Sequence, residues 1–156
     1  MSRVILPGSY DPVTLGHLAI IKRAAELYDE VYAVIFVNPD KVYTFTEDER
    51  KEMLAAAVRE IPGVAVDSCK GLVIDYMREH GIEKIVKGYR NDADLEYEKI
   101  QAEYNLSRGG YETEFILADE GMRNISSSLA RTLIARGEDL SGVLPESVID
   151  CIRQRK

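Results

Sequence analysis

The segment from Pro7 to His17 concentrates groups that can bind an anion. Ser9 and Thr14 supply hydroxyls, His17 supplies an imidazole, and two glycines let the backbone come close to a ligand. An apolar run precedes this segment and a helical pattern follows it, so it joins a strand to a helix start. Free N–H groups and about half a positive charge gather at such a start. A capped turn with a packed histidine is the simpler alternative, but the combination of residues favours a phosphate site.

Three further segments carry basic or hydroxyl side chains directly after apolar runs. Lys41 follows the run 31–37, and Lys87 and Arg90 bracket Gly88 after a short run. Three serines, Ser126 to Ser128, open a helical pattern. Each feature alone is compatible with a solvated charge, an exposed basic turn or a simple helix cap. Their repetition at equivalent places indicates a common site for phosphates.

Strand and helix patterns alternate along the chain, and this alternation predicts an α/β fold. Strands are expected at 3–7, 31–37, 64–66, 84–87 and 113–118. Helices are expected at 17–28, after the capping box Thr46–Glu49, at 72–80, from an Asp92 cap to about 107, from a Ser126 cap to Gly137, and from Pro145 onward. We predict a Rossmann-like, doubly wound parallel sheet in one domain, residues 1–156. Ligands then bind at the carboxyl ends of the strands.

Composition narrows the functional classes. The net charge of −7 disfavours nucleic acid and anionic membranes as partners, and no apolar run is long enough to span a bilayer. Cys69 and Cys151 are expected to be structural thiols, and two histidines are too few for a histidine-rich zinc site. With no secretory signal visible, we expect a cytoplasmic protein.

The segment Thr14-Leu15-Gly16-His17 resembles the (H/T)-x-G-H signature of a nucleotidyltransferase superfamily, and the form with threonine first is similar to that of the phosphopantetheine adenylyltransferases. The other three segments stand in that family's order and separation, and the likeness runs from the first strand to Glu146. Lys87 departs from the arginine usual at its position. Residues 106–124 are the least typical part.

The resemblance implies roles for individual residues. Catalytic roles fall on His17, Thr14, Lys41 and Arg90. Contacts with ATP fall on Ser9, Tyr10, His17, Gly88, Tyr89, Arg90, Glu98, Met122, Arg123, Asn124, Ile125, Ser126, Ser127 and Ser128. Contacts with the second substrate, 4′-phosphopantetheine, fall on Ser9, Lys41, Leu72, Val73 and Lys87.

The implied reaction moves the adenylyl group of ATP to 4′-phosphopantetheine and gives dephospho-coenzyme A and pyrophosphate. The resemblance also implies Mg²⁺ carried by ATP with no metal site built from side chains, coenzyme A as a product or feedback ligand, and a homohexamer. Direct in-line attack is expected because no nucleophile–base pair is visible. Two alternatives stay open. One is another enzyme of the superfamily, such as a cytidylyltransferase or a nicotinamide mononucleotide adenylyltransferase. The other is a non-catalytic nucleotide-binding protein.

Overall fold

The fold is built on one five-stranded parallel sheet. The structure, a computed structural model, describes residues 2–155. Its strands are β1 (Arg3–Gly8), β2 (Glu30–Phe36), β3 (Val64–Cys69), β4 (Lys84–Tyr89) and β5 (Thr113–Leu117), in the spatial order β3-β2-β1-β4-β5. This confirms the predicted α/β class with a parallel sheet. One domain over 1–156 stays a prediction, and Met1 and Lys156 lie outside the described residues.

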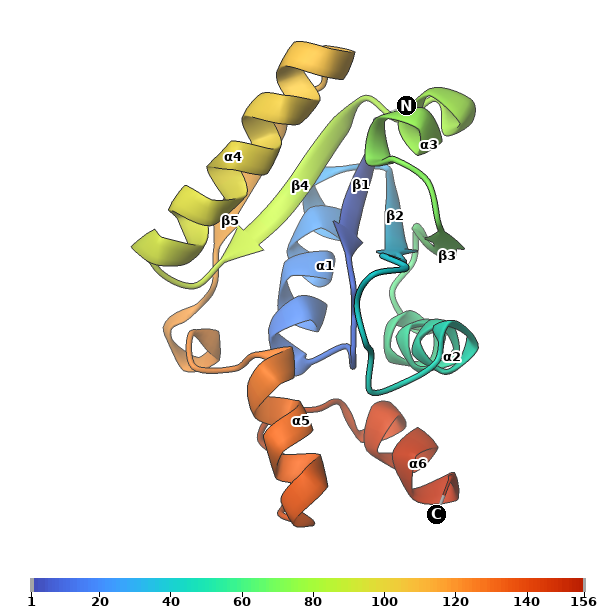
Figure 1. Cartoon of the computed structure of the whole chain (residues 1–156), viewed down its shortest axis with the longest axis vertical. Helices are drawn as coiled ribbons and strands as arrows, with labels where there is room; N and C mark the ends of the chain where they lie inside the picture. The colour runs from blue at the N-terminus through green and yellow to red at the C-terminus, as the bar shows by residue number, and fades with distance from the viewer. Residues whose placement is uncertain (1, 156) are drawn as a thin grey trace.

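Helices cover both faces of the sheet, as doubly wound topology requires (Figure 1). They are α1 (Leu15–Leu27), α2 (Glu47–Val58), α3 (Val73–His80), α4 (Asp92–Gly109), α5 (Ser127–Arg136) and α6 (Glu146–Gln154), with a short 3₁₀ helix η1 (Glu120–Met122). Across residues 2–155, none of these helices combines the length and the apolar character needed to cross a membrane.

Two apolar clusters fix the helices on the sheet. The larger one joins one sheet face to α1, α2, α5 and α6, and the smaller one joins the other face to α3. Helix α4 lies over β4 and β5 without any buried residue of its own. The chain steps from β1 to β2 on one side and returns to β4 on the other. This topological switch point opens a crevice at the carboxyl ends of β1 and β4.

Helix caps follow the predictions closely, with one correction. Thr46 and Glu49 form the predicted capping box, and Ser126 caps α5 by accepting a hydrogen bond from the Leu129 N–H. The expectation that Asp92 caps α4 is wrong: the cap is Asn91, whose side chain accepts from the Asp94 N–H. Both residue types cap well, so local sequence does not separate these neighbours.

Two strands run at least two residues further than predicted, and β1 runs one residue further, to Gly8. Strand β3 continues to Cys69 because its backbone pairs with β2 through Phe36. Strand β4 continues to Tyr89 because it pairs with β5, Tyr89 facing Leu117. The basic segment around Gly88 therefore ends a strand instead of forming a loop after it. Helix α1 starts two residues earlier than expected, at Leu15, because Thr14 supplies its cap.

Candidate active site

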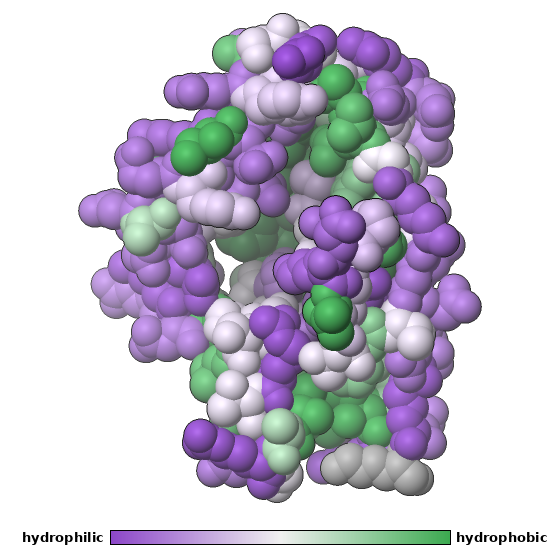
Figure 2. Space-filling view, in the orientation of Figure 1, coloured by the Kyte–Doolittle hydropathy of each residue, from purple (hydrophilic) through white to green (hydrophobic). Residues whose placement is uncertain are grey.

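A cleft of about 530 Å³ opens at the switch point. Figure 2 shows a hollow near the centre of this face, beside the hydrophilic surface of α4. The walls of the cleft come from the end of β1, the start of α1, the loop after β2, the end of β4, α4 and the start of α5. Segments far apart in sequence thus meet here because parallel strands bring their carboxyl ends to one edge.

His17 is held by the turn that begins α1. It occupies the third helical position behind the Thr14 cap, and the two residues form a reciprocal capping box. The Thr14 hydroxyl accepts from the His17 N–H at 3.2 Å, and the Thr14 N–H donates to His17 Nδ1 at 3.0 Å. A glutamate or glutamine usually fills this role. One imidazole nitrogen is therefore fixed by the helix start, and Nε2 remains for a ligand in the cleft.

The environment of His17 keeps its ring neutral. Burial is the largest cause, and together with the positive charges of Lys87 and Arg90 it lowers the pKa of His17 to about 4. Because Nδ1 accepts a hydrogen bond from a backbone N–H, the single ring proton of the neutral form belongs on Nε2. The imidazole therefore offers the cleft an N–H donor without a full charge.

Tyr10 supports this ring from the side. The two ring centroids lie 5.0 Å apart at an angle of 57°, and the buried Tyr10 hydroxyl donates to the Leu6 carbonyl at 2.8 Å. Burial raises the Tyr10 pKa, so the hydroxyl keeps its proton. Tyr10 thus orients His17 mainly by packing and is anchored to β1 by its own hydroxyl.

Two cations at the end of β4 are each paired with a carboxylate of α4. Lys87 Nζ lies 3.3 Å from Glu98 Oε2 and also donates to the Pro7 carbonyl. Arg90 donates from Nε and Nη2 to the two oxygens of Asp94, at 2.8 and 3.2 Å. This bidentate contact leaves the Nη1 side of Arg90 free to donate to a phosphate. The Arg90 ion pair lowers the Asp94 pKa against the opposing effect of burial.

The start of α5 brings hydroxyl and N–H groups to the same cleft. Ser126 uses its side chain as the cap, and Ser127 donates its hydroxyl to the Pro12 carbonyl at 2.8 Å. The backbone N–H groups of Ser127 and Ser128 sit in the first turn, where a helix offers no internal acceptor. Arg131, one turn further, lines the cleft and donates to the Asp11 carbonyl at 2.9 Å. This helix start suits a polyphosphate.

Lys41 lies on the loop between β2 and α2 and lines the cleft. Its N–H donates to the Asn38 carbonyl, and its Nζ lies 5.5 Å from the Tyr43 ring centroid. The Tyr43 hydroxyl in turn accepts from the Asn38 N–H at 2.9 Å. Lys41 is exposed, so these contacts and not burial define its place.

A second, smaller pocket of about 230 Å³ adjoins the cleft and shares Ser9, Lys87 and Glu98 with it. Its own lining is largely apolar, with Phe36, Val73 and Ala102 among the residues. The site therefore has a charged compartment and a narrower apolar one, which meet at the end of β1.

Most of the predicted site residues converge on these two compartments, with three exceptions. The cleft and pocket are lined by Ser9, Tyr10, Thr14, His17, Lys41, Val73, Lys87, Gly88, Tyr89, Arg90, Glu98, Met122, Ile125, Ser126, Ser127 and Ser128. Leu72, Arg123 and Asn124 line neither compartment. Leu72 is half exposed before α3, Arg123 donates to the Ala118 carbonyl, and Asn124 faces solvent. Their predicted contacts stay predictions.

The structure adds lining residues that sequence reasoning missed. Asp94, Tyr97 and Arg131 reach the cleft from helices. Asp94 and Tyr97 belong to the same stretch of α4 as Glu98, and Arg131 lies one helical turn beyond Ser127, so helical spacing was the available signal. Among residues 2–155, no group of three or more His, Cys, Asp or Glu side chains is arranged to hold a metal ion.

Comparison with known proteins places this chain in a family. The family model described as Cytidylyltransferase-like matches residues 5–133. A phosphopantetheine adenylyltransferase of Frankia casuarinae is 42% identical to this chain, over 99% of the chain and 98% of the relative. One of Corynebacterium efficiens is 40% identical, over 98% and 97%. The chain belongs to the cytidylyltransferase-like family.

The phosphopantetheine adenylyltransferase of Frankia alni is also 42% identical, with 99% and 98% of the two chains covered. As a member of the cytidylyltransferase-like family, the chain carries its charged cleft within the matched residues, from Leu6 on β1 to Arg131 on α5. Helix α6, which packs on α2, lies beyond the match.

Proposed function

We propose that the protein transfers the adenylyl group of ATP reversibly to 4′-phosphopantetheine, giving dephospho-coenzyme A and pyrophosphate. The observation that carries the proposal is the joining of two unlike compartments. A cleft with imidazole, lysine, arginine and serine groups meets an apolar pocket at the end of β1. A nucleoside triphosphate fits the first, and a thin uncharged arm ending in a phosphate fits the second. The near full-length relatives support the same pair.

In this proposal the reaction is a direct in-line displacement at the α-phosphorus. A phosphate oxygen of the acceptor forms the new P–O bond, and the bond to the β-phosphate oxygen breaks to release pyrophosphate. The acceptor phosphate is already anionic, so proton transfer contributes little. Catalysis then rests on positioning and on stabilising the charge that develops in the transition state.

Each group has a part that its geometry supports. The His17 Nε2–H donates to an oxygen of the α-phosphate, with Thr14 fixing the ring. Lys41 and Lys87 orient the acceptor phosphate near Ser9, where the compartments meet. Arg90, through Nη1, and the start of α5 receive the departing pyrophosphate.

Glycine at position 88 lets α1 approach the end of β4, because a Cβ there would lie 2.7 Å from Ile20 Cγ1. Tyr89 and Glu98 complete the proposed ATP side of the cleft.

Magnesium enters this proposal as part of the substrate. The carboxylates lining the cleft are Asp11, Asp94 and Glu98, and all three are engaged with protein donors. A site built from protein ligands does not fit this arrangement. We propose that Mg²⁺ arrives on the phosphates of ATP, held by phosphate oxygens and water.

Pyrophosphate release tests the proposal. The protein is incubated with Mg²⁺ and either ATP or CTP, each with 4′-phosphopantetheine, nicotinamide mononucleotide or other phosphorylated acceptors. Release that requires ATP and 4′-phosphopantetheine together is the expected result. Release with another pair alone would move the chain to a different nucleotidyltransferase activity. Absence of release with every pair would leave a non-catalytic nucleotide-binding protein.

We also propose a homohexamer, feedback binding of coenzyme A and a cytoplasmic location. Helix α4 exposes Ile100, Tyr104 and Leu106, which supports burial of this helix against other copies. Both cysteines are free, which suits a reducing compartment. Light scattering should give six times the 17.5 kDa chain mass, and coenzyme A should compete with ATP. A monomer, or no competition, would contradict the respective proposal.

A further inference from the structure

Arg50 is a buried cation that the proposed chemistry does not use. It lies in the first turns of α2 with 2% of its surface exposed. Within residues 2–155, it forms no ion pair with an aspartate or glutamate. A buried charge without a carboxylate is costly unless other groups replace its hydration, so its retention calls for a physical reason.

Backbone carbonyls and one aromatic ring replace that hydration. Nε donates to the Phe45 carbonyl at 3.1 Å and more weakly to the Thr46 carbonyl at 3.4 Å, and Nη1 donates to the Ser9 carbonyl at 3.0 Å. The guanidinium carbon lies 3.9 Å from the centroid of the Tyr43 ring. Only a planar, forked cation can make these contacts at once. Arg50 therefore ties the loop after β1 to the loop after β2.

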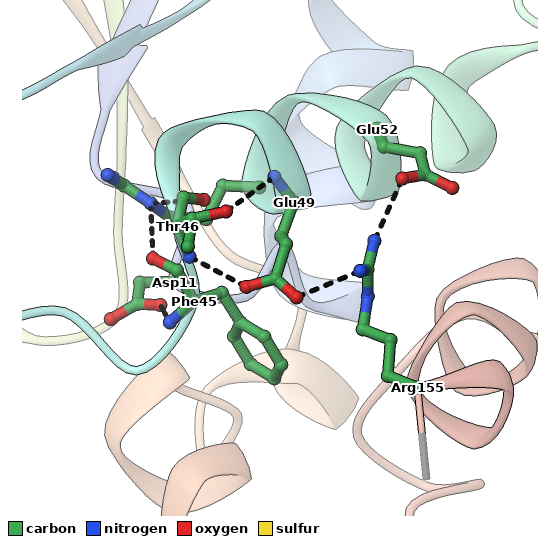
Figure 3. A network of polar contacts seen from close by, with 7 residues as sticks. Asp11, Phe45, Thr46, Glu49, Glu52 and Arg155 are labelled. Atoms are coloured by element: carbon green, nitrogen blue, oxygen red, sulfur yellow. Dashed lines mark hydrogen bonds and ion pairs between the residues drawn. The ribbon is translucent and has the colours of Figure 1, made fainter.

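Asp11 makes a second link between the same two loops. Its buried carboxylate accepts from the Thr44 N–H at 2.9 Å and the Phe45 N–H at 3.0 Å. Figure 3 shows this contact beside the Thr46–Glu49 capping box at the start of α2. The loop after β2 is thus held at its end by a carboxylate and a guanidinium.

Tyr43 connects this anchor to Lys41. The Tyr43 ring has Arg50 stacked on it and Lys41 Nζ at 5.5 Å, while its hydroxyl closes the loop at Asn38. The Tyr43 ring thus lies against both the buried guanidinium and the lysine that lines the cleft.

We propose that Arg50 is a positioning residue for the acceptor phosphate, acting by fixing the loop that carries Lys41 against the loop that carries Ser9. The inference rests on the proposed function, because Lys41 and Ser9 are the groups assigned to the acceptor side. The inference requires no contact between Arg50 and either substrate, because Arg50 does not line the cleft.

The test separates acceptor binding from ATP binding and from folding. Arg50→Lys keeps the charge but loses the fork and the stacking. Tyr43→Leu removes the ring from a loop without disturbing the core. This variant therefore stays folded even if Arg50→Lys does not. Both variants should raise the KM for 4′-phosphopantetheine at least about tenfold, with the KM for ATP within about threefold. Arg59→Lys, an exposed change on the end of the same helix, is the matched control and should leave both constants unchanged.

A double-mutant cycle with Lys41→Ala decides whether Arg50 acts through Lys41. In the Lys41→Ala background, Arg50→Lys should add less than about threefold to the acceptor KM, because the positioned group is gone. Full multiplication of the two effects, equal rises in both KM values, or an unchanged acceptor KM in active variants would overturn the inference. No turnover by the unaltered protein with ATP and 4′-phosphopantetheine would instead overturn the proposed function, and the inference with it.

Discussion

In the proposed function His17 has two separable tasks, and two substitutions distinguish them. Its Nδ1 closes the capping box of α1, and its Nε2–H faces the cleft. His17→Ala removes both groups. His17→Gln keeps a side-chain acceptor at the third helical position, where glutamine is a normal capping-box residue. The glutamine therefore repairs the helix start without restoring the ring donor held against Tyr10.

The structure sets the expected magnitudes. Loss of one preorganised donor to a transition-state oxyanion lowers kcat by about 10²–10³, or about 2.7–4 kcal/mol. Loss of the reciprocal cap lowers the free energy of unfolding by about 1 kcal/mol, which shifts the Tm by about 2–4 °C in a chain of this size. We expect the large kcat loss with His17→Ala together with the Tm shift. His17→Gln should keep the Tm within about 1 °C and still lose at least about tenfold in kcat.

Steady-state pyrophosphate release gives kcat, thermal unfolding gives the Tm, and calorimetry gives the Kd for ATP. The ATP Kd should change little in both variants, because the donor is needed mainly in the transition state. Wild-type kcat with His17→Gln would mean that the alanine variant failed only through its helix cap. A kcat for His17→Ala within about tenfold of wild type would refute the catalytic role outright.

Three further predictions concern the titration of His17, the glycine at position 88 and the ion pairs of Arg155. Burial, together with the charges of Lys87 and Arg90, places the His17 pKa near 4, below its unfolded value of about 6.5. The contribution of the neutral His17 ring to stability is therefore complete above pH 6.5 and is lost as the pH falls towards 4. NMR titration with His17→Gln as the assignment control should show a ring with no midpoint between pH 5.5 and 8, and a midpoint near 6.5 would contradict this argument. Gly88→Ala places a Cβ 2.7 Å from Ile20 Cγ1 and should lower the free energy of unfolding by about 1–3 kcal/mol in denaturant unfolding. Ile20→Ala removes Cγ1, Cγ2 and Cδ1, so Gly88→Ala should cost less in the Ile20→Ala background than in the wild type. An equal cost of Gly88→Ala in both backgrounds would show that the clash is not the cause. Arg155→Ala removes ion pairs to two glutamates of α2 and should cost about 1 kcal/mol at low ionic strength and less in 1 M salt, whereas a salt-independent loss would indicate packing instead.

The order of elements was predictable because helical and strand patterns alternate with strong punctuation. Thr46–Glu49 and Ser126 marked helix starts correctly because their caps involve only neighbouring residues. Strand ends were less predictable. The extension of β4 to Tyr89 depends on pairing with β5, and nothing in the local sequence reports that pairing.

The site residues were likewise predictable where their contacts are local and unpredictable where their contacts are distant in sequence. The groups of the β1–α1 segment and the serines were visible in the sequence, because glycine and hydroxyl residues at a helix start have a local meaning. The Arg50 contacts were invisible, because its acceptors are carbonyls up to 41 positions away and a carbonyl has no sequence signature. Leu72, assigned by resemblance, lies outside the pocket because its side chain faces solvent at the start of α3.

The pairing of Lys87 with Glu98 and of Arg90 with Asp94 has a consequence for selectivity. In the free protein the two cations already have internal counter-ions, so a single small anion gains little by replacing one of them. A triphosphate can engage both cations, Arg90 through its Nη1 side, and the start of α5 in one event, which a single small anion cannot do. The carboxylates of α4 would then favour the binding of ligands with several linked phosphates over the binding of single anions. A chain with a net charge of −7 can in this way hold a polyanion site that simple inorganic anions occupy poorly.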